Sequence, residues 1–577
     1  MYKRLISIIL ILAIIISTID ISGLEVNAAG LDYSYGRLLQ TALYFYDANM
    51  CGTEVGERSA FSWRNDCHTG DTKVTIDGKT VDVSGGFHDA GDHLKAGLPQ
   101  GYSATMLGIA YMEYKSAFAE TKSTKHLQVI TDHFCEYFEK CTVLNGDGSV
   151  DFFVYQVSDG DEDHKKWAAP ETQNDVRHVY YTSKKNPATD EVSEAAAALA
   201  LQYINFNDSK ALDYSKKLFS YAKSFSDKKV AKEGLFDSST GGYLYDSQSW
   251  GDDYALAASL LFKATGDGMY KSEFDSIKNS NQGGYNIYSW LSWDNVSALA
   301  DYYGAGAKDS LKVCADNMKK SDKEYSCLLE WGSARYNCNT QFLGLLYDKA
   351  SGNKTYKSWA NRQMKYILGN NKQKNCYVIG YNSRSVKYPH HRAASASNDA
   401  GSVSPNRHVL LGGLVGGPKD SWGNYTDSQS DYQCNEVALD YNAGLVAAAA
   451  ALYTAYKNDG KASHSLMSAK DLNKAELRFN YGLGISVPRL KSVKNNKKKA
   501  VTVKWSKNSK ASGFELQYSL KKNFKTKKQI NVTGTKKKIS KLKKGKVYYI
   551  RIRSYKFTDS KKEYSAWSQV KKVKIKK

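Results

Sequence analysis

The stretch AGLVAAAAALYTAY, residues 443–456, is the clearest of several alanine-rich segments that decide the fold class. Its apolar residues recur every three to four positions, the spacing of one face of an α-helix. The same pattern recurs in residues 193–203, 254–264, 339–347 and 357–368. Glycine- and aspartate-rich loops separate these segments. About a dozen helices joined by long polar loops predict an all-α body of paired helices, with functional groups on the loops at one end.

The pattern changes after residue 457. Residues 458–488 form an expected linker with one short helix, and segments beyond it alternate apolar and polar residues at the period of a β-strand. They predict a small all-β sandwich over residues 489–577. With 577 residues the chain has room for both parts, and its 42% hydrophobic and 24% charged residues exclude a mostly disordered protein.

The N-terminus has the features of a secretory signal peptide. Lys3 and Arg4 precede an apolar run over residues 5–16, and small residues near Ala28 offer a cleavage site. A membrane span would need about 20 apolar residues, so an uncleaved anchor is the weaker alternative. We predict that residues 1–28 are removed and that the protein is secreted and extracellular, with cell-surface association as an option.

The net charge of +22 hides two unlike parts. Residues 486–577 carry 31 Lys and Arg against three acidic residues, a net of +28, while the rest of the chain has a net of −6. Such a basic tail could contact an anionic cell envelope, bind polysaccharide weakly or act as a spacer without a ligand. Nucleic acid would also attract it, but we expect no nucleic-acid partner for an exported protein.

Nine cysteines leave at least one unpaired. Cys51 with Cys67, or Cys314 with Cys327, are close enough in sequence to close loop-sized disulfides, but a large body does not need them. No C-x-x-C occurs, which gives little support to a structural zinc site. We expect free, mostly buried thiols.

Two carboxylates lie three residues apart in the segment GGFHDAGDH, residues 85–93. Asp89 and Asp92 stand among glycines that allow tight backbone turns, so both can point into one small volume. There they could hold and deprotonate a water molecule. A calcium loop or simple turn chemistry fits the same pattern, and for this pattern alone those readings are favoured.

A third carboxylate, Glu436, stands just before the alanine-rich stretch, framed by Tyr432, Cys434 and Tyr441. Such surroundings can desolvate a carboxyl group, raise its pKa and keep it protonated as an acid. The alternative is a helix-start carboxylate favoured by the helix dipole. Nearer the middle of the chain, residues 389–392 (PHHR) concentrate hydrogen-bond donors; sugar binding or structural packing suits them better than a metal, since no third ligand is spaced to join them.

Together these three segments resemble glycoside hydrolase family 9, the inverting cellulases with an (α/α)6 barrel. The aspartate pair matches the family's D-A-G-D loop, and Pro389, His390 and Arg392 match its P-H-x-R element. The second family signature matches without a departure at Tyr425, Asp427, Tyr432, Glu436, Ala438, Asn442 and Ala443. The similarity implies that residues 29–457 form an all-α (α/α)6 barrel.

The resemblance also implies roles. Asp92 would be the general base that activates the attacking water, Asp89 would help to position that water, and Glu436 would be the general acid. Inversion needs the two carboxyl groups about 6.5–9.5 Å apart. Asp427 would support the site, and the implied substrate-binding residues are His164, Trp167, Trp331, Arg335, His390, Arg392 and Tyr441.

Family members often bind calcium near the site, which implies Asp252, Asp253 and Asp294 as ligands of a possible structural calcium. Asp253 departs from the usual glutamate, so that carboxylate is shorter. Phe87-His88 is a second departure, because the family commonly has an aromatic residue followed by tyrosine. No cofactor is expected for catalysis.

The resulting expectation is a secreted, monomeric endo-β-1,4-glucanase (cellulase) that hydrolyses internal bonds of soluble or amorphous β-1,4-glucan with inversion. The same barrel could instead act on another β-glucan, on a glucosamine polymer or from the chain end. A secreted glycan-binding protein without catalysis is the alternative from a different class. The tail resembles a fibronectin type III sandwich, with Trp505 as its buried tryptophan and residues 548–553 as a central strand.

Overall fold

The computed structural model describes residues 33–399, 401–402, 404–458, 465–467, 475–477, 479–481, 485–508, 511–558, 561–565 and 567–576. The predicted signal peptide lies outside the described residues. The described residues of the expected linker hold no helix. Across the described part of the chain, none of the helices combines the length and apolar character that crossing a membrane requires.

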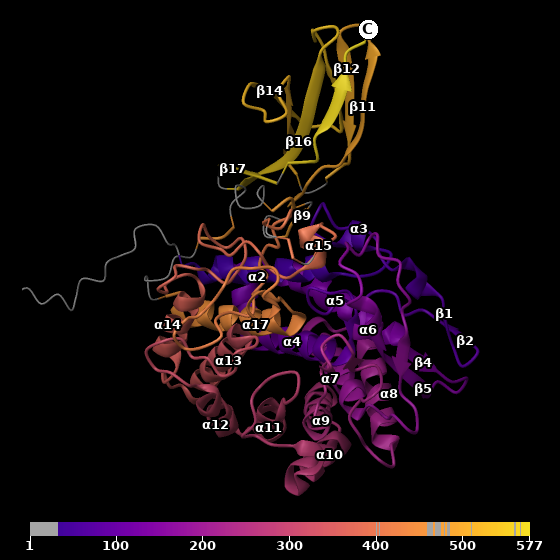
Figure 1. Cartoon of the computed structure of the whole chain (residues 1–577), viewed down its shortest axis with the longest axis vertical. Helices are drawn as coiled ribbons and strands as arrows, with labels where there is room; N and C mark the ends of the chain where they lie inside the picture. The colour runs from indigo at the N-terminus through magenta and orange to yellow at the C-terminus, as the bar shows by residue number, and fades with distance from the viewer. Residues whose placement is uncertain are drawn as a thin grey trace, which may run out of the picture. The chain divides into compact units, whose positions relative to one another are not determined.

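In the part of the chain that the structure describes, six pairs of helices form the body, which confirms the predicted barrel (Figure 1). The inner helices, buried along most of their length, are α4 (Gly97–Glu120), α7 (Thr189–Phe206), α9 (Gly251–Thr265), α11 (Ser297–Ala305), α13 (Ser333–Ser351) and α17 (Leu439–Tyr456). The outer helices are α2 (Tyr35–Asn49), α5 (Thr124–Cys141), α8 (Ser209–Ser224), α10 (Gly268–Ser280), α12 (Lys308–Met318) and α14 (Lys357–Ile367).

Alanine explains the inner ring. It is the best helix former, and its small side chain lets helices approach closely. α17 carries a run from Ala447 to Ala451 in which every residue is buried, and it packs against α4 and α13. α8, in contrast, buries only one face, so it covers the ring from outside. Because each outer helix returns the chain, all inner helices begin at the same end of the barrel, and the loops before them meet there.

Short elements connect the helices. The helical ones are α3 (Val55–Arg58), η2 (Thr69–Thr72), α6 (Gly160–Asp163), η3 (Gln282–Gly284), α15 (Arg392–Ser395) and α16 (Tyr432–Asn435). The strands are β1 (Val74–Ile76) with β2 (Lys79–Val81); β5 (Val150–Val157), paired with β3 (Lys95–Ala96), β4 (Thr142–Leu144) and β6 (Val179–Tyr181); and β7 (Phe236–Asp237) with β8 (Gly242–Tyr243), all antiparallel.

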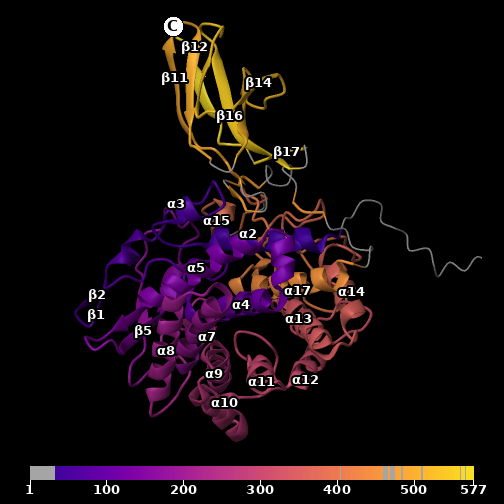
Figure 2. The same cartoon turned by 180° about the vertical axis from the view of Figure 1, so that it is seen from behind.

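The C-terminal part is all-β (Figure 2). After the pair β9 (Phe479–Asn480) and β10 (Ile485–Ser486), one sheet has the order β11 (Leu490–Lys497), β12 (Ala500–Trp505), β15 (Lys536–Ile539). The second has the order β14 (Lys527–Val532), β13 (Gly513–Ser519), β16 (Val547–Thr558), β17 (Lys561–Tyr564), with β18 (Lys571–Lys574) also on β16. Inward-facing residues of both sheets, including Trp505, Leu516 and Ile550, form one core.

Candidate active site

Backbone hydrogen bonds join the three sequence motifs at the start of the inner helices. The Arg392 amide donates to Gly91 O at 2.9 Å, and the Leu439 amide at the start of α17 donates to Asp89 O at 3.0 Å. A Cβ atom at Gly91 would lie 2.0 Å from the His390 carbonyl oxygen, so only glycine permits this approach. The D-A-G-D loop, the P-H-x-R element and the Glu436 signature therefore form one site.

Asp92 belongs to a row of charged groups. Its Oδ2 lies 3.1 Å from Nε2 of His164, whose Nδ1 lies 2.8 Å from Oδ2 of the buried Asp237. Burial alone would lower the pKa of His164, but the hydrogen bond and charge of Asp92 outweigh it and raise this pKa to about 9. An imidazolium at neutral pH donates from both nitrogens, so it holds Asp92 on one side and Asp237 on the other.

Asp89 lies deeper than Asp92. The Tyr245 hydroxyl donates to Asp89 Oδ2 at 2.6 Å, while Oδ1 is buried and has no protein partner. Burial, with the charge of Asp92, raises the pKa of Asp89 well above its usual range. Its Oδ1 is thus a polar atom without a protein partner that a water molecule can contact.

Glu436 has a different environment. Burial, then the charge of Asp92, raises the pKa of Glu436 to about 7, whereas His164 and a hydrogen bond from the Trp331 indole lower it. Its main chain is fixed, since Glu436 O accepts from the Gly416 amide at 2.8 Å. A carboxyl group with this pKa is largely protonated in mildly acidic solution and can donate its proton.

A row of rings borders the two carboxyl groups. Trp167 meets His390 edge-on at 4.8 Å between centroids, His390 lies 6.1 Å from Tyr432, and Tyr432 lies 5.4 Å from Trp331. Trp331 and Tyr432 are 43% and 45% exposed. His390 Nδ1 is 2.7 Å from Gln429 O, and burial lowers the pKa of His390, so the ring is neutral and its Nε2 can accept a hydrogen bond.

The two predicted arginines are buried in ion pairs. Arg335 Nη1 donates to Asp440 at 2.7 Å, and Arg392 Nη1 donates to Asp163 at 2.6 Å. The Nε–H of each is buried without a protein partner, so each keeps one donor for a bound ligand. The buried ring of Tyr441 lies under Arg335, with 4.8 Å from Cζ to its centroid.

Asp427 supports the site indirectly. Its carboxylate accepts from the amides of Lys387 and Tyr388 at 2.9 and 3.1 Å, which anchors the segment leading into His390. Three residues that sequence reasoning missed also belong to the site: Asp237, Tyr245 and Asp163. Asp163 stands beside the predicted His164 in sequence, which was an available signal. Asp237 and Tyr245 had none, because only the fold brings them to His164 and Asp89.

The predicted calcium ligands are dispersed. Asp252 accepts from the Val296 amide at 2.7 Å and from Ser249, and Asp294 accepts from the Gln248 amide at 3.0 Å. Asp253 lies beside Glu194, and burial raises its pKa well above the usual range. Within the described residues, these three carboxylates do not converge as a compact group of donors.

Two other groups of donors do converge. The first is Asp92, Asp163 and His164, with donor atoms within 4.8 Å of one another. There Arg392 neutralises Asp163, and the imidazole bridges Asp92 and Asp237. Charge pairing therefore accounts for this group without a cation.

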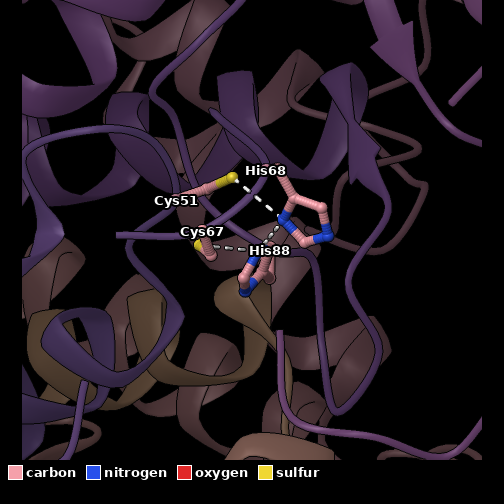
Figure 3. Close-up of side chains that lie close together, drawn as sticks. All are labelled: Cys51, Cys67, His68 and His88. Carbon is pink, nitrogen blue, oxygen red and sulfur yellow. Dashed lines mark hydrogen bonds between the residues drawn. The ribbon is translucent and has the colours of Figure 1, made fainter. Parts of the chain in front are cut away.

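The second group joins Cys51, Cys67, His68 and His88, four buried residues whose donor atoms also lie within 4.8 Å of one another (Figure 3). Cys51 Sγ is 3.6 Å from His68 Nδ1, and Cys67 Sγ is 3.8 Å from His88 Nε2. Two thiols and two imidazoles are a donor set that suits tetrahedral Zn²⁺. All nine cysteines are free thiols, so Cys51 and Cys67 are not bridged.

This Cys–His cluster adjoins the D-A-G-D loop. His88 directly precedes Asp89, while the two cysteines come from the chain after α2 and from the loop before η2. The Cys51 amide donates to Gly86 O at 2.9 Å and the His88 amide to Asn49 O at 2.8 Å, so the D-A-G-D loop is tied to α2. A cation bound by these four groups would fix the position of Asp89 from one side.

Comparisons with known proteins agree with this site. The sequence profile described as "Glycosyl hydrolase family 9" matches residues 35–449. Endoglucanase B of Cellulomonas fimi is 32% identical over 466 residues, which is 74% of this chain and 43% of that protein. The chain thus spans less than half of that relative's length.

Two solved structures match this chain over nearly their whole length. The catalytic domain of Clostridium thermocellum CelT has a TM-score of 0.68 at 38% identity, covering 75% of this chain and 99% of that one. The cellulase Cel9M of C. cellulolyticum in complex with cellobiose has a TM-score of 0.66 at 34% identity, covering 74% and 99%. A profile that runs from α2 into α17, across all three motifs that meet at Asp92 and Glu436, shows that the chain belongs to glycosyl hydrolase family 9.

Proposed function

We propose that this protein is a secreted endo-β-1,4-glucanase, a cellulase that hydrolyses internal bonds of cellulose and related glucans with inversion. The observation that carries the proposal is one site with two unlike carboxyl groups: Asp92 bonded to a cationic His164, and Glu436 with a pKa of about 7. Paired groups whose environments separate their protonation states are the requirement for acid–base hydrolysis of a glycoside. The endoglucanase and cellulase relatives support the same activity.

In this reaction Asp92 accepts a proton from the water that attacks the anomeric carbon. Asp89 holds that water through Oδ1, its free atom, while Tyr245 occupies Oδ2. The imidazolium of His164 balances the negative charge of the base until the proton arrives. Glu436 donates its proton to the departing glycosidic oxygen, and the Trp331 indole N–H then stabilises the carboxylate that remains.

The rings and buried donors hold the sugar chain. Trp167, Trp331 and Tyr432 offer flat surfaces for the apolar faces of glucose units, and His390 Nε2 accepts from a hydroxyl. The unpartnered Nε–H groups of Arg335 and Arg392 are donors at the edge of the site. In the proposed inverting reaction, these groups hold a glucan chain that runs past both Asp92 and Glu436.

The test is reducing-sugar release and viscosity of carboxymethyl cellulose with the mature protein and its Glu436→Gln variant. A rapid fall in viscosity with wild type, lost in the variant, is the expected result. The anomer released first, read by proton NMR, must be the α-anomer if inversion is right. No release from any β-1,4-glucan would overturn the proposal, and equal activity of both proteins would overturn Glu436 as the acid.

We also propose that the protein leaves the cell after removal of residues 1–28 and acts as a monomer. The β-domain is proposed to be fibronectin type III-like, supported by its two sheets and buried Trp505. With its net charge of +28, we propose contact with an anionic cell-envelope polymer. Binding of the full-length protein to such a polymer should weaken steeply as salt is raised; binding that ignores salt contradicts it.

A structural calcium is proposed near Asp252 and Asp294, the two predicted carboxylates whose charges interact, and its binding would have to draw them together because they do not converge among the described residues. Carboxylate and carbonyl oxygens suit Ca²⁺, although Asp253 faces Glu194 and is not among the proposed ligands. If the proposal is right, calcium raises the melting temperature of wild type but not of Asp294→Asn. An equal response of both proteins would argue against this site.

A further inference from the structure

A cavity of about 420 Å³ lies among the loops at the end of the barrel where the inner helices begin. Its walls come from the segments that precede α7 and α9, from the chain between α8 and β7, and from η3. None of its lining residues belongs to the site of Asp92 and Glu436 described above. A volume of this size is within the range of small-molecule binding sites.

Lysines dominate the charge of this cavity. The lining contains four basic side chains and one acidic side chain: Lys185, Lys228, Lys229, Lys232 and Glu233. Two of the lysines are neutralised by aspartates outside the lining, because Lys229 Nζ lies 2.5 Å from Asp227 and Lys232 pairs with Asp246. The other two lysines make no ion pair within the part of the chain that the structure describes. Set against Glu233, they leave the lining with a net charge of +1.

Lys228 is held in place without a carboxylate. Its ammonium donates to Lys223 O at 3.2 Å and to Phe225 O at 3.1 Å, which leaves one of its three N–H groups for a ligand. Burial outweighs the charge of Glu273 and lowers the pKa of Lys228, so a negative charge nearby would stabilise the ammonium form. The carbonyl groups fix this side chain but do not neutralise it, and the cavity therefore favours an anionic ligand.

The backbone that carries these lysines is fixed to the barrel. The Thr189 amide at the start of α7 donates to Lys229 O at 2.7 Å. The Ala231 amide donates to the buried Asp190 carboxylate at 3.0 Å. Residues 228–233 are thus held against the first turn of an inner helix, so their lysines stand on a rigid support.

Trp250 gives the cavity an apolar wall. Its amide donates to Gly283 O at 2.9 Å, and a Cβ atom at Gly283 would lie 2.5 Å from Trp250 Cε2. Gly283 also has a φ of +60°, so only glycine suits this position against the indole. A ring fixed in this way loses little freedom when a ligand packs on it.

We propose that this cavity binds an acidic sugar, a hexuronic acid unit whose carboxylate pairs with Lys185 and Lys228 and whose apolar face packs on Trp250. The single negative charge of a uronate matches the net charge of the lining, whereas a phosphorylated sugar brings about 1.5 to 2 charges. Glu233 accepts hydrogen bonds from the sugar hydroxyls. This site is additional to the proposed hydrolytic site and does not depend on its activity.

The test is a ligand-observed NMR titration of the full-length protein with glucuronate, glucose and glucose 6-phosphate. A salt concentration of about 0.15 M screens non-specific attraction to the basic β-domain. Glucuronate should bind about 10-fold more tightly than glucose, as expected for a charge-assisted hydrogen bond, and more tightly than glucose 6-phosphate. The double variant Lys185→Met, Lys228→Met should lose this preference. The matched control is Lys308→Met, Lys354→Met, which removes two exposed lysines that follow inner helices and so lie at the other end of the barrel; it should keep the preference.

The contact with the indole has its own variant. Trp250→Leu should weaken glucuronate binding by about 2- to 10-fold, the range for one aromatic contact. Unchanged affinity in this variant would overturn the role of Trp250.

The remaining outcomes also count against the proposal. Equal affinity of wild type for glucuronate and glucose overturns it, and so does a preference that survives in the Lys185 and Lys228 variant. Loss of the preference in the control variant as well would assign it to overall charge, and tighter binding of glucose 6-phosphate would overturn the uronate. If the lysine variant does not fold, the wild-type comparison of the three sugars still decides. None of these measurements uses hydrolysis, so the proposed function is tested separately.

Discussion

The two halves of the active site stabilise the same chemical group in opposite ways. On the side of Asp92, the proposed base, a row of alternating charges runs through His164 to Asp237. On the acid side, Glu436 adjoins Trp331 and Tyr432, and burial dominates its pKa. Burial raises the pKa of Glu436, whereas Asp92 is paired with a cation, so the fold gives the two carboxyl groups opposite surroundings without changing their chemistry.

The two halves also differ in how they are anchored. The base-side loop is irregular and is tied to the end of α2 and to Cys51 by backbone bonds at His88 and Gly86, and His88 is also a member of the Cys–His cluster. Glu436 instead stands three residues before α17, a long buried helix that needs no further anchor. A charged, irregular loop requires contacts with other segments to hold it, whereas a side chain close to the start of a core helix is positioned by that helix.

Among the variants that test this difference, Asp92→Asn should have the largest effect. Removing the base should lower kcat on a soluble β-glucan by about 100- to 10,000-fold, the usual worth of general base catalysis. Because Asp92 supplies the charge that raises the pKa of His164 to about 9, this pKa should also fall in the variant. Kinetics and NMR titration of the imidazole measure the two effects.

A variant with more than a tenth of wild-type kcat would show that another group is the base. Unchanged thermal unfolding and unchanged cellotriose binding are the controls, since they separate loss of chemistry from loss of structure.

The anchoring difference is tested by metal removal. If the Cys–His cluster holds zinc, a chelator should destabilise wild type by about 3 kcal/mol, the value for a ligand at a hundred times its Kd. In a chain of this size that corresponds to a fall of a few degrees in Tm. Cys67→Ser should start at the lower Tm and ignore the chelator, whereas Cys327→Ser, a half-buried thiol outside the cluster, should behave like wild type.

Differential scanning fluorimetry with added zinc and metal analysis of the purified protein make these measurements. Protein that contains no zinc and whose Tm ignores both zinc and chelator would refute the metal assignment. The base-side loop would then be held by hydrogen bonds alone.

Sequence patterns predicted the features that depend on local spacing. The helix pairs followed from alanine-rich runs such as residues 443–456, and the catalytic candidates followed from motifs in which the critical residues are close together. Helical period and short motifs are encoded within a few residues, so they can be read without the fold.

Contacts between distant residues could not be predicted in this way. His164 contacts Asp237 across 73 positions of the chain, and Tyr245 contacts Asp89 across 156. No local sequence motif marks Asp237 or Tyr245. The Cys–His cluster shows the same limit, because no C-x-x-C marks it and its four donors come from three separate segments. Cys51 and Cys67 reach the same point only because an antiparallel bridge joins Gly52 to Cys67.

A smaller effect should follow from Asp237→Asn. The imidazole of His164 would lose its charged partner on Nδ1, and we expect kcat to fall about 10-fold with little change in KM, as for a lost charge-assisted hydrogen bond. The pKa of His164 should fall less than in Asp92→Asn, because Asp92 is the main source of its increase. Asp161→Asn is the matched control: this half-buried neighbour accepts from the Ser238 amide and not from the imidazole. Equal behaviour of the two variants would remove Asp237 from the base side.

The smallest change addresses the acid side alone. The indole N–H of Trp331 lowers the pKa of Glu436, which burial holds at about 7. Trp331→Phe keeps a ring for stacking but removes this donor, so the carboxylate loses a stabilising bond and the pKa of Glu436 should rise by less than about one unit. Glu436 must be protonated to act, and therefore the basic limb of kcat/KM against pH should move to higher pH while the acidic limb stays in place. A basic limb that is unchanged or moves to lower pH would mean that the indole does not act through the acid, and that burial alone separates the two halves of the site.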